Sequence, residues 1–211
     1  TSFTLNAAVV PVLQIVPNAL CYTSAAGLTL TANVVSGGDG NFQYSLNGGT
    51  YTASNTFAGL APGNHSITVR DGKNCTDTEV ITINPELTVT AAADPISACA
   101  TSTQITITAA GGDGNYVYSV VANGATPSNG SFSPSTTRTV NSVGDYDVYV
   151  RDNNGNSGYC VAMYDITITK DAPLAISVAE TPIQCSGDSS GSIAITPSGG
   201  SAPYRYSLDN G

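Results

Sequence analysis

The 211-residue chain has few cationic side chains, a single His and no Trp. Its six Lys and Arg residues stand singly along the sequence, so there is no basic patch of the kind that binds nucleic acid or an anionic membrane surface. The 15 Asp and Glu residues give a formal net charge of −9, which we interpret as a solubility feature. We therefore expect no nucleic acid and no membrane surface among the partners.

Long apolar runs and helical patterns are also missing. The apolar run near 7–16 is broken by Pro11 and Gln14 and is too short to span a bilayer. No basic segment precedes it, so it does not have the form of a signal peptide. If the protein is secreted, its signal is expected outside this sequence. Thr, Ser, Asn and Gly are abundant instead, and they favour β-strands and tight turns over helices.

The sequence does contain a repeat, which is clearest at a glycine turn. Its three copies begin at Gly37, Gly111 and Gly199, and each leads into two aromatic residues spaced two apart. This period of two is typical of a strand with one buried face. We expect the second aromatic residue of each copy to lie in the core rather than in an exposed stripe that stacks on sugars: Tyr44, Tyr118 and Tyr206.

Further landmarks recur in register with this turn. They are a Pro before an alternating strand and a Cys, a second alternating strand, and a strand that ends in Arg-Asp before another Cys. Six or seven short strands per repeat predict an all-β fold, with tandem Ig-like antiparallel β-sandwich repeats in an extended array. The expected boundaries are 1–10 as the last strand of a preceding repeat, 11–84 as an Ig-like repeat, 85–172 as a repeat with a hairpin insertion at 121–134, and 173–211 as the N-terminal part of a further repeat.

Each complete repeat has one early and one late cysteine, and this predicts a disulfide within each repeat. The expected pairs are Cys21 with Cys75 and Cys99 with Cys160, while Cys185 is an early cysteine left unpaired in this window. Disulfides indicate an oxidising, extracytoplasmic setting. Because the chain has no Cys-x-x-Cys motif and only one His, the cysteines fit disulfides better than a zinc site.

The order of these landmarks resembles the SprB-type repeat of large cell-surface adhesins in gliding and related Bacteroidetes. The third copy, from Cys185 onward, carries Gly-Ser-Ile-Ala-Ile-Thr and then Gly-Gly-x-x-Pro-Tyr-x-Tyr-Ser-Leu-Asp, the pattern of that family. The first copy supplies the Phe-x-Gly-Leu step at 57–60. The second copy lacks this step between Phe132 and Val143, so its loop geometry is expected to differ.

This resemblance implies a non-catalytic stalk segment of a very long, secreted protein at the bacterial cell surface. Such proteins act in adhesion or gliding motility, and the resemblance also implies export by the type IX system. The expected partners are neighbouring repeats of the same polypeptide or other copies of a filament, with an unknown surface or glycan ligand elsewhere. Two alternatives stay open: a self-assembling filament subunit that exchanges strands between partial repeats, and a carbohydrate-binding module.

Two motifs that could carry catalysis are better explained by the fold. Residues 187–191 match Gly-x-Ser-x-Gly, but that nucleophile motif needs a strand, a turn and a helix with a nearby His. The only histidine, His65, takes the place of Tyr146 in the next repeat, where an aromatic side chain packs at a sandwich corner. We therefore expect no enzyme activity and no catalytic residues.

One loop has oxygen-bearing side chains at alternate positions, as calcium loops do. It lacks the Gly and Glu of an EF-hand, because Ser157 and Met163 stand at those positions. Calcium between adjacent modules is therefore a hypothesis, and the alternative is that Asp and Asn serve turn geometry. Otherwise no cofactor is expected. The calcium candidates are Asp71, Asp77, Asp152, Asn154 and Asn156.

Overall fold

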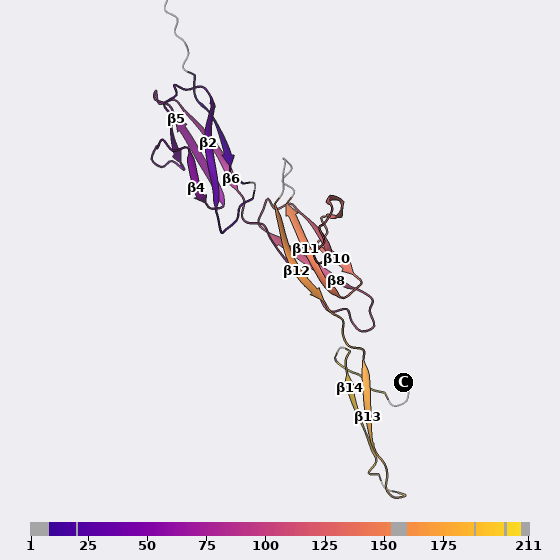
Figure 1. The fold of residues 1–211 in the computed structure, drawn as a ribbon. Helices are drawn as coiled ribbons and strands as arrows, with labels where there is room; N and C mark the ends of the chain where they lie inside the picture. The colour runs from indigo at the N-terminus through magenta and orange to yellow at the C-terminus, as the bar shows by residue number, and fades with distance from the viewer. Residues whose placement is uncertain (1–8, 20, 153–159, 188, 201, 208–211) are drawn as a thin grey trace, which may run out of the picture. The chain divides into compact units, whose positions relative to one another are not determined.

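A computed structural model shows that the chain is all-β (Figure 1). It describes residues 9–19, 21–152, 160–187, 189–200 and 202–207. The chain divides into two compact units. Unit 1 comprises Thr1–Val89, Ala109–Val117 and Val150–Ala162, and unit 2 comprises Thr90–Thr108, Tyr118–Tyr149 and Met163–Gly211. Among the described residues, no helix is long and apolar enough to cross a membrane.

The first repeat forms two three-stranded antiparallel sheets, with strand orders β1-β2-β4 and β3-β5-β6. In the register, Pro17 lies opposite Leu30, and Gly63 lies opposite Ile83. Apolar and polar residues alternate along these strands, as the sequence predicts for strands with one buried face. The strands are β1 (Val12–Pro17), β2 (Leu28–Ser36), β3 (Gln43–Leu46), β4 (Thr56–Leu60), β5 (Gly63–Arg70) and β6 (Thr76–Ile83).

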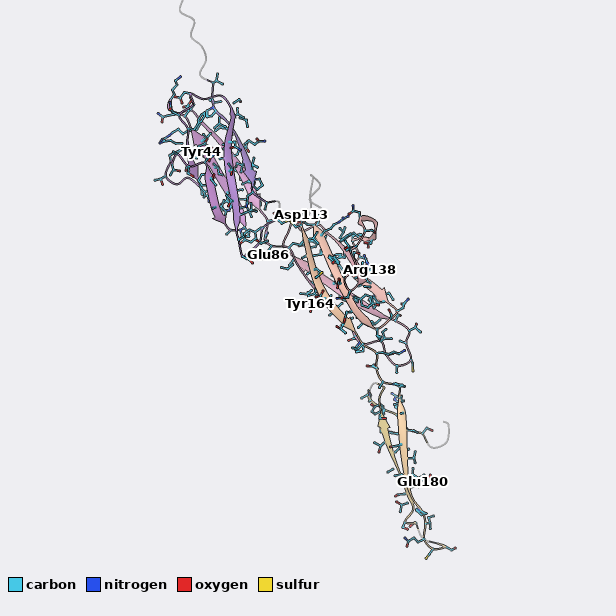
Figure 2. The ribbon with its side chains drawn as sticks, in the orientation of Figure 1. Tyr44, Glu86, Asp113, Arg138, Tyr164 and Glu180 are labelled. Carbon is cyan, nitrogen blue, oxygen red and sulfur yellow. A yellow bond between two sulfur atoms is a disulfide. The ribbon has the colours of Figure 1, made fainter. Side chains whose placement is uncertain are left out.

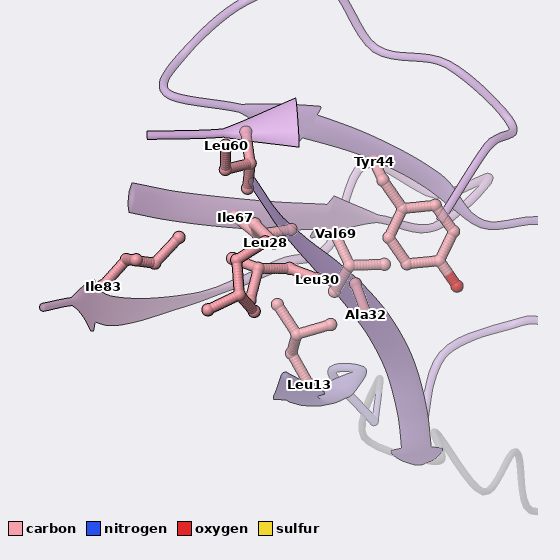
Figure 3. Packing of buried hydrophobic residues seen from close by; sticks show 9 residues of the cluster. All are labelled: Leu13, Leu28, Leu30, Ala32, Tyr44, Leu60, Ile67, Val69 and Ile83. Atoms are coloured by element: carbon pink, nitrogen blue, oxygen red, sulfur yellow. The ribbon is translucent and has the colours of Figure 1, made fainter. Parts of the chain in front are cut away.

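The core of this sandwich takes side chains from all six strands (Figure 3). Leu30, Ile67 and Val69 are fully buried at its centre. Tyr44 is buried too, and this burial raises the pKa of its phenol, because the charged form would lose its hydration. The cluster consists of Leu13, Leu28, Leu30, Ala32, Tyr44, Leu60, Ile67, Val69 and Ile83.

The second repeat forms two more three-stranded sheets, with strand orders β10-β8-β7 and β12-β11-β9. Buried apolar side chains again alternate along its strands, among them Ile105, Val148 and Val150. Its elements are β7 (Thr88–Ala92), β8 (Thr103–Ala110), β9 (Tyr116–Ala122), the short 3-10 helix η1 (Asn129–Ser131), β10 (Thr137–Val140), β11 (Gly144–Asp152) and β12 (Val161–Ile168).

The third copy of the repeat forms only one hairpin within the described residues. Its strands β13 (Ala175–Thr181) and β14 (Ser192–Ser198) pair antiparallel, with Val178 opposite Ile195. Apolar side chains alternate on this hairpin as they do in β1 and β2, yet Ile176 and Ile193 are largely exposed.

The glycine turns are explained by close backbone contacts. Each first glycine has a positive φ, of 75° at Gly37, 80° at Gly111 and 66° at Gly199. A Cβ atom at any of these positions would overlap a backbone carbonyl of the segment that leads into the first strand of the repeat, that of Val10, Glu86 or Pro173 respectively. Glycine is thus needed for its backbone conformation and for the lack of a side chain.

The all-β sandwich prediction is confirmed, and so is the core position of Tyr44 and Tyr118. The same expectation is wrong for Tyr206, which is 57% exposed because no second sheet covers the β13–β14 hairpin among the described residues. Most of the segment 1–10 lies outside the described residues. The predicted repeat boundaries stay predictions.

Candidate functional site

Unit 1 holds a disulfide that the sequence did not predict. It joins Cys21 to Cys160, with 5.5 Å between the two Cα atoms and a sequence separation of 139. Cys75, Cys99 and Cys185 are free thiols in this structure. The expected pairs, Cys21 with Cys75 and Cys99 with Cys160, are therefore corrected.

The first expected pair fails because its cysteines lie at opposite ends of the same sandwich. Cys21 follows β1, at the end where Gly63 pairs with Ile83, whereas Cys75 directly precedes β6, at the end where Arg70 pairs with Thr76. The eight residues of β6 lie between these two ends, a span of about 25 Å at roughly 3.3 Å per residue. A disulfide requires Cα atoms within about 7 Å of each other.

The second expected pair fails for the same reason. Cys160 directly precedes β12. Cys99 follows Ile96, whose backbone exchanges hydrogen bonds of 2.8 and 2.9 Å with Thr169 and Asp171, just beyond the other end of that strand. The eight residues of β12 thus separate the two cysteines, so the early and late cysteines of one repeat cannot reach each other.

A buried aspartate holds each late cysteine in position. In the first repeat, Asp71 Oδ1 accepts the N–H of Cys75 at 2.8 Å, and the N–H of Asp71 donates to the carbonyl of Cys75 at 3.0 Å. In the second repeat, Asp152 and Cys160 form the same two hydrogen bonds, at 2.7 and 3.2 Å. Both carboxylates are buried, and these backbone donors satisfy them. We call this arrangement the Asp–Cys clamp.

The glycine turn is tied to the first clamp by another aspartate. Asp39 Oδ1 accepts the N–H of Asn41 and the N–H of Gly72, each at 3.0 Å. These two backbone hydrogen bonds hold the pKa of Asp39 below its ordinary value, because they favour the charged carboxylate. In the second copy, Asp113 accepts the N–H of Asn115 at 2.8 Å. The repeated Asp therefore shapes the turn.

A cavity of about 170 Å³ lies beside the disulfide in unit 1. Its lining includes the largely apolar side chains of Tyr22, Leu30 and Leu87 together with Asp152 and Cys160. Glu86 directly precedes the lining residue Leu87 in the sequence, and its carboxylate accepts the N–H of Ser24 at 3.0 Å (Glu86 is labelled in Figure 2). Hydrogen bonds from the side chain and backbone of Ser24 lower the pKa of Glu86.

The calcium candidates have backbone partners where the structure describes them. Asp71 and Asp152 form the two clamps, and Asp77 Oδ2 accepts the N–H of Leu13 at 2.8 Å, which links β6 to β1. Asn154 and Asn156 lie outside the described residues. In the part of the chain that is described, no three His, Cys, Asp or Glu side chains gather closely enough to hold a metal ion. Calcium binding stays a hypothesis.

The two corner residues behave as the sequence indicated. His65 Nε2 lies 2.8 Å from the carbonyl of Ala61, and Tyr146 donates its hydroxyl to the carbonyl of Ser142 at 3.0 Å. Both partners lie four residues upstream. His65 Nδ1 lies 3.3 Å from Asn47 Nδ2. The histidine replaces a tyrosine as a structural side chain.

Sequence reasoning missed a second tyrosine contact. Tyr116 and Tyr204 donate their hydroxyls to the carbonyls of Gly111 and Gly199, at 2.6 and 2.7 Å. Each tyrosine thereby fixes the glycine turn five residues before it. The Tyr in Gly-Gly-x-x-Pro-Tyr was the available signal, but Phe42 occupies this position in the first copy and hid the pattern.

The insertion of the second repeat is held by one arginine. Arg138 on β10 donates to the carbonyl of Tyr118 at 2.9 Å, to Ser133 Oγ at 2.8 Å and to the carbonyl of Ser135 at 3.1 Å (Arg138 is labelled in Figure 2). Tyr118 and Ser133 also form a bridge, which closes the loop 121–134 back onto β9. The loop is therefore an anchored hairpin insertion.

The Gly-x-Ser-x-Gly match lies in the connection between β13 and β14, with Asp188 outside the described residues. A strand follows it rather than a helix, since β14 begins at Ser192. The context that a nucleophile elbow requires is not present here.

Comparison with known families identifies an SprB repeat at residues 177–211. The chain therefore contains this repeat in its third copy, and the resemblance predicted from the sequence is confirmed there. The matching model describes a repeat module rather than a catalytic family. No curated protein sequence matches the chain.

Several solved structures are similar in fold. A C-terminal 282-residue fragment of intimin, solved in complex with the intimin-binding domain of the translocated intimin receptor, aligns with a TM-score of 0.49 and 14% identity, over 77% of this chain and 65% of that one. The three N-terminal domains of the bacteriophage RB49 outer capsid protein Hoc align with a TM-score of 0.41 and 19% identity, over 92% and 71%. A structure addressing Dscam isoform specificity aligns with a TM-score of 0.28 and 12% identity, over 76% and 42%. The chain thus spans slightly less than two thirds of the intimin fragment, and its own sheets define its fold class.

Proposed function

We propose that this chain is a non-catalytic stalk segment of a long adhesin at the bacterial cell surface. In this role, tandem β-sandwiches hold a distal binding region away from the cell and support adhesion or gliding. The SprB repeat at 177–211 supports the cell-surface setting. Export by the type IX system and a surface or glycan ligand elsewhere in the protein are further parts of the proposal.

The observation that carries the proposal is the covalent link between two copies of the repeat. Cys21 belongs to the first predicted repeat and Cys160 to the second. A chain pulled from its two ends must extend every segment that is not bridged by a covalent bond. Because this disulfide bridges 139 residues, it shields most of two repeats from extension, as a stalk under load requires.

The test is the mass and exposure of the native polypeptide. Cells are labelled with a reagent that cannot cross membranes, and the protein is then detected under reducing, denaturing conditions with an antibody against this chain. We expect a labelled polypeptide many times heavier than 21.3 kDa. An unlabelled protein, or one near 21.3 kDa, would contradict the stalk proposal.

One observation favours a second candidate, a filament subunit that assembles by strand exchange. The β13–β14 hairpin exposes Ile176, Val178 and Ile193, so a strand from another copy could cover this face. A native mass near 21.3 kDa together with filaments in electron micrographs would favour this candidate over the stalk.

A further inference from the structure

We propose that the disulfide Cys21–Cys160 is one member of a series, in which the early cysteine of each repeat bonds to the clamp cysteine of the following repeat. Cys75, Cys99 and Cys185 then have partners in neighbouring repeats of the same polypeptide. The inference extends the stalk proposal and rests on it in one respect, since it requires that the polypeptide contains further repeats.

The two late cysteines have the same local geometry. Cys75 and Cys160 each sit in an Asp–Cys clamp, with the same pair of backbone and carboxylate hydrogen bonds. Both are half-buried, and both directly precede the last strand of their repeat. The Asp–Cys clamp that holds Cys160, the partner of an early cysteine, is therefore present at Cys75 as well.

The three early cysteines occupy equivalent positions. Cys21, Cys99 and Cys185 each lie in the connection between the first two strands of their copy, which are β1 and β2, β7 and β8, and β13 and β14. Cys99 and Cys185 are exposed, so a partner can reach their sulfur atoms.

Strand length excludes a disulfide within one repeat. About 25 Å of strand separates the early cysteine of a repeat from its own clamp, by the length of β6 or β12. The only pair that the structure brings within bonding distance is Cys21 of the first repeat and Cys160 of the second, among the cysteines described. In sequence order, this is an early cysteine and the clamp cysteine of the next repeat.

If each early cysteine bonds to the clamp cysteine of the following repeat, each free thiol has an expected kind of partner. Cys75, a clamp cysteine, pairs with the early cysteine of the repeat before it. Cys99 and Cys185, which are early cysteines, pair with clamp cysteines that follow an Arg-Asp in the next repeats. For each bond, two thiols lose two protons and two electrons, and the disulfide of a thiol oxidase accepts them and becomes a dithiol.

The direct test is a disulfide map of the native protein. Thiols are blocked with N-ethylmaleimide before lysis, and the protein is digested without reduction and analysed by mass spectrometry. We expect Cys21 linked to Cys160, Cys75 linked to an early-type cysteine, and Cys99 and Cys185 linked to clamp-type cysteines. The proposal is overturned if Cys75, Cys99 and Cys185 carry maleimide, or if a Cys21–Cys75 or Cys99–Cys160 link is found. It is also overturned if the mass of the intact protein falls on reduction, because the partner cysteine would then belong to another copy.

A second test needs only the 211-residue chain and does not depend on how its variants fold. Thiols are counted in denaturant after oxidative refolding. With five cysteines and one disulfide, 5 − 2 = 3 thiols are expected, four in Cys21→Ser and two in the control Cys75→Ser. Pairing within repeats gives one thiol in the unmodified chain and two in Cys21→Ser, which would overturn the proposal. Neither test depends on surface labelling, so the stalk proposal and this one can fail separately.

Discussion

The first repeat and the third copy have the same strand pattern and very different burial. Leu28 and Leu30 on β2 are buried, and so are Ile105 and Ile107 on β8. Ile193, at the matching position of β14, is 58% exposed. An alternating sequence therefore sets the strand and the face, but a second sheet is needed to bury that face.

The difference has a direct consequence for stability. Fully burying an aliphatic side chain contributes about 1.5–3 kcal/mol, and a two-stranded hairpin alone is marginal in water. The first repeat buries nine apolar residues between its sheets, whereas β13 and β14 have no facing sheet among the described residues. We infer that the first two repeats carry the stability of this chain.

The largest expected effect comes from truncating an aliphatic side chain on β2, compared with one on β14. Leu30→Ala should lower the free energy of unfolding by about 2–5 kcal/mol, because it leaves a cavity between two packed sheets. Ile193→Ala, the matched control on β14, should change it by less than about 0.5 kcal/mol. Urea unfolding followed by circular dichroism measures both variants. Equal losses would mean that the hairpin is packed as tightly as the first repeat.

The next effect tests the covalent link. Cys160→Ser should lower the free energy of unfolding by about 2–4 kcal/mol, because the unfolded chain loses a long closed loop. Cys75→Ser removes a thiol that is free in this chain and should leave stability nearly unchanged. Urea unfolding with and without a reductant gives the comparison. A larger loss in Cys75→Ser than in Cys160→Ser would contradict the observed pairing.

A glycine pair gives a smaller effect. Gly111→Ala should destabilise by roughly 1–3 kcal/mol, because the new Cβ atom meets the backbone of Glu86 at a positive φ. Gly114→Ala, with a similar φ of 85° and open space around it, should cost less. Thermal unfolding measures the loss of stability in each variant. Equal losses in Gly111→Ala and Gly114→Ala would show that the close contact with Glu86 contributes nothing.

The smallest effect concerns pH. The pKa of Glu86 is below its ordinary value of 4.5, so its carboxylate stabilises the folded state above that pH, and this contribution is lost as pH falls through the folded pKa. Glu86→Gln should lower Tm slightly near pH 7, and the two Tm values should converge in acid. A difference that stays constant from pH 7 down to pH 3 would argue against a charged hydrogen bond to Ser24.

The sequence predicted much of the fold because local patterns determine it. Alternating strands, glycine turns and the Tyr146 corner each follow from residues close together in the chain, and the structure contains them. The disulfide pairing depends on which end of a sandwich each loop occupies. Two cysteines in one repeat look like natural partners until the register places Cys21 and Cys75 at opposite ends of the strands.

The burial of the third copy was missed for a related reason. Tyr206 has a local sequence similar to that of Tyr44 and Tyr118, but its exposure depends on strands that would face it from a second sheet. The described residues of the third copy form one hairpin, β13–β14, and no strand of a second sheet.

Amide hydrogen exchange along equivalent strands tests the central claim most directly, which is that burial between two sheets, and not the strand pattern, makes a stable repeat. We expect slow exchange in β2 and β8 and exchange at least about tenfold faster in β14, where local opening costs little. Equal protection of the three strands in the 211-residue chain would contradict it.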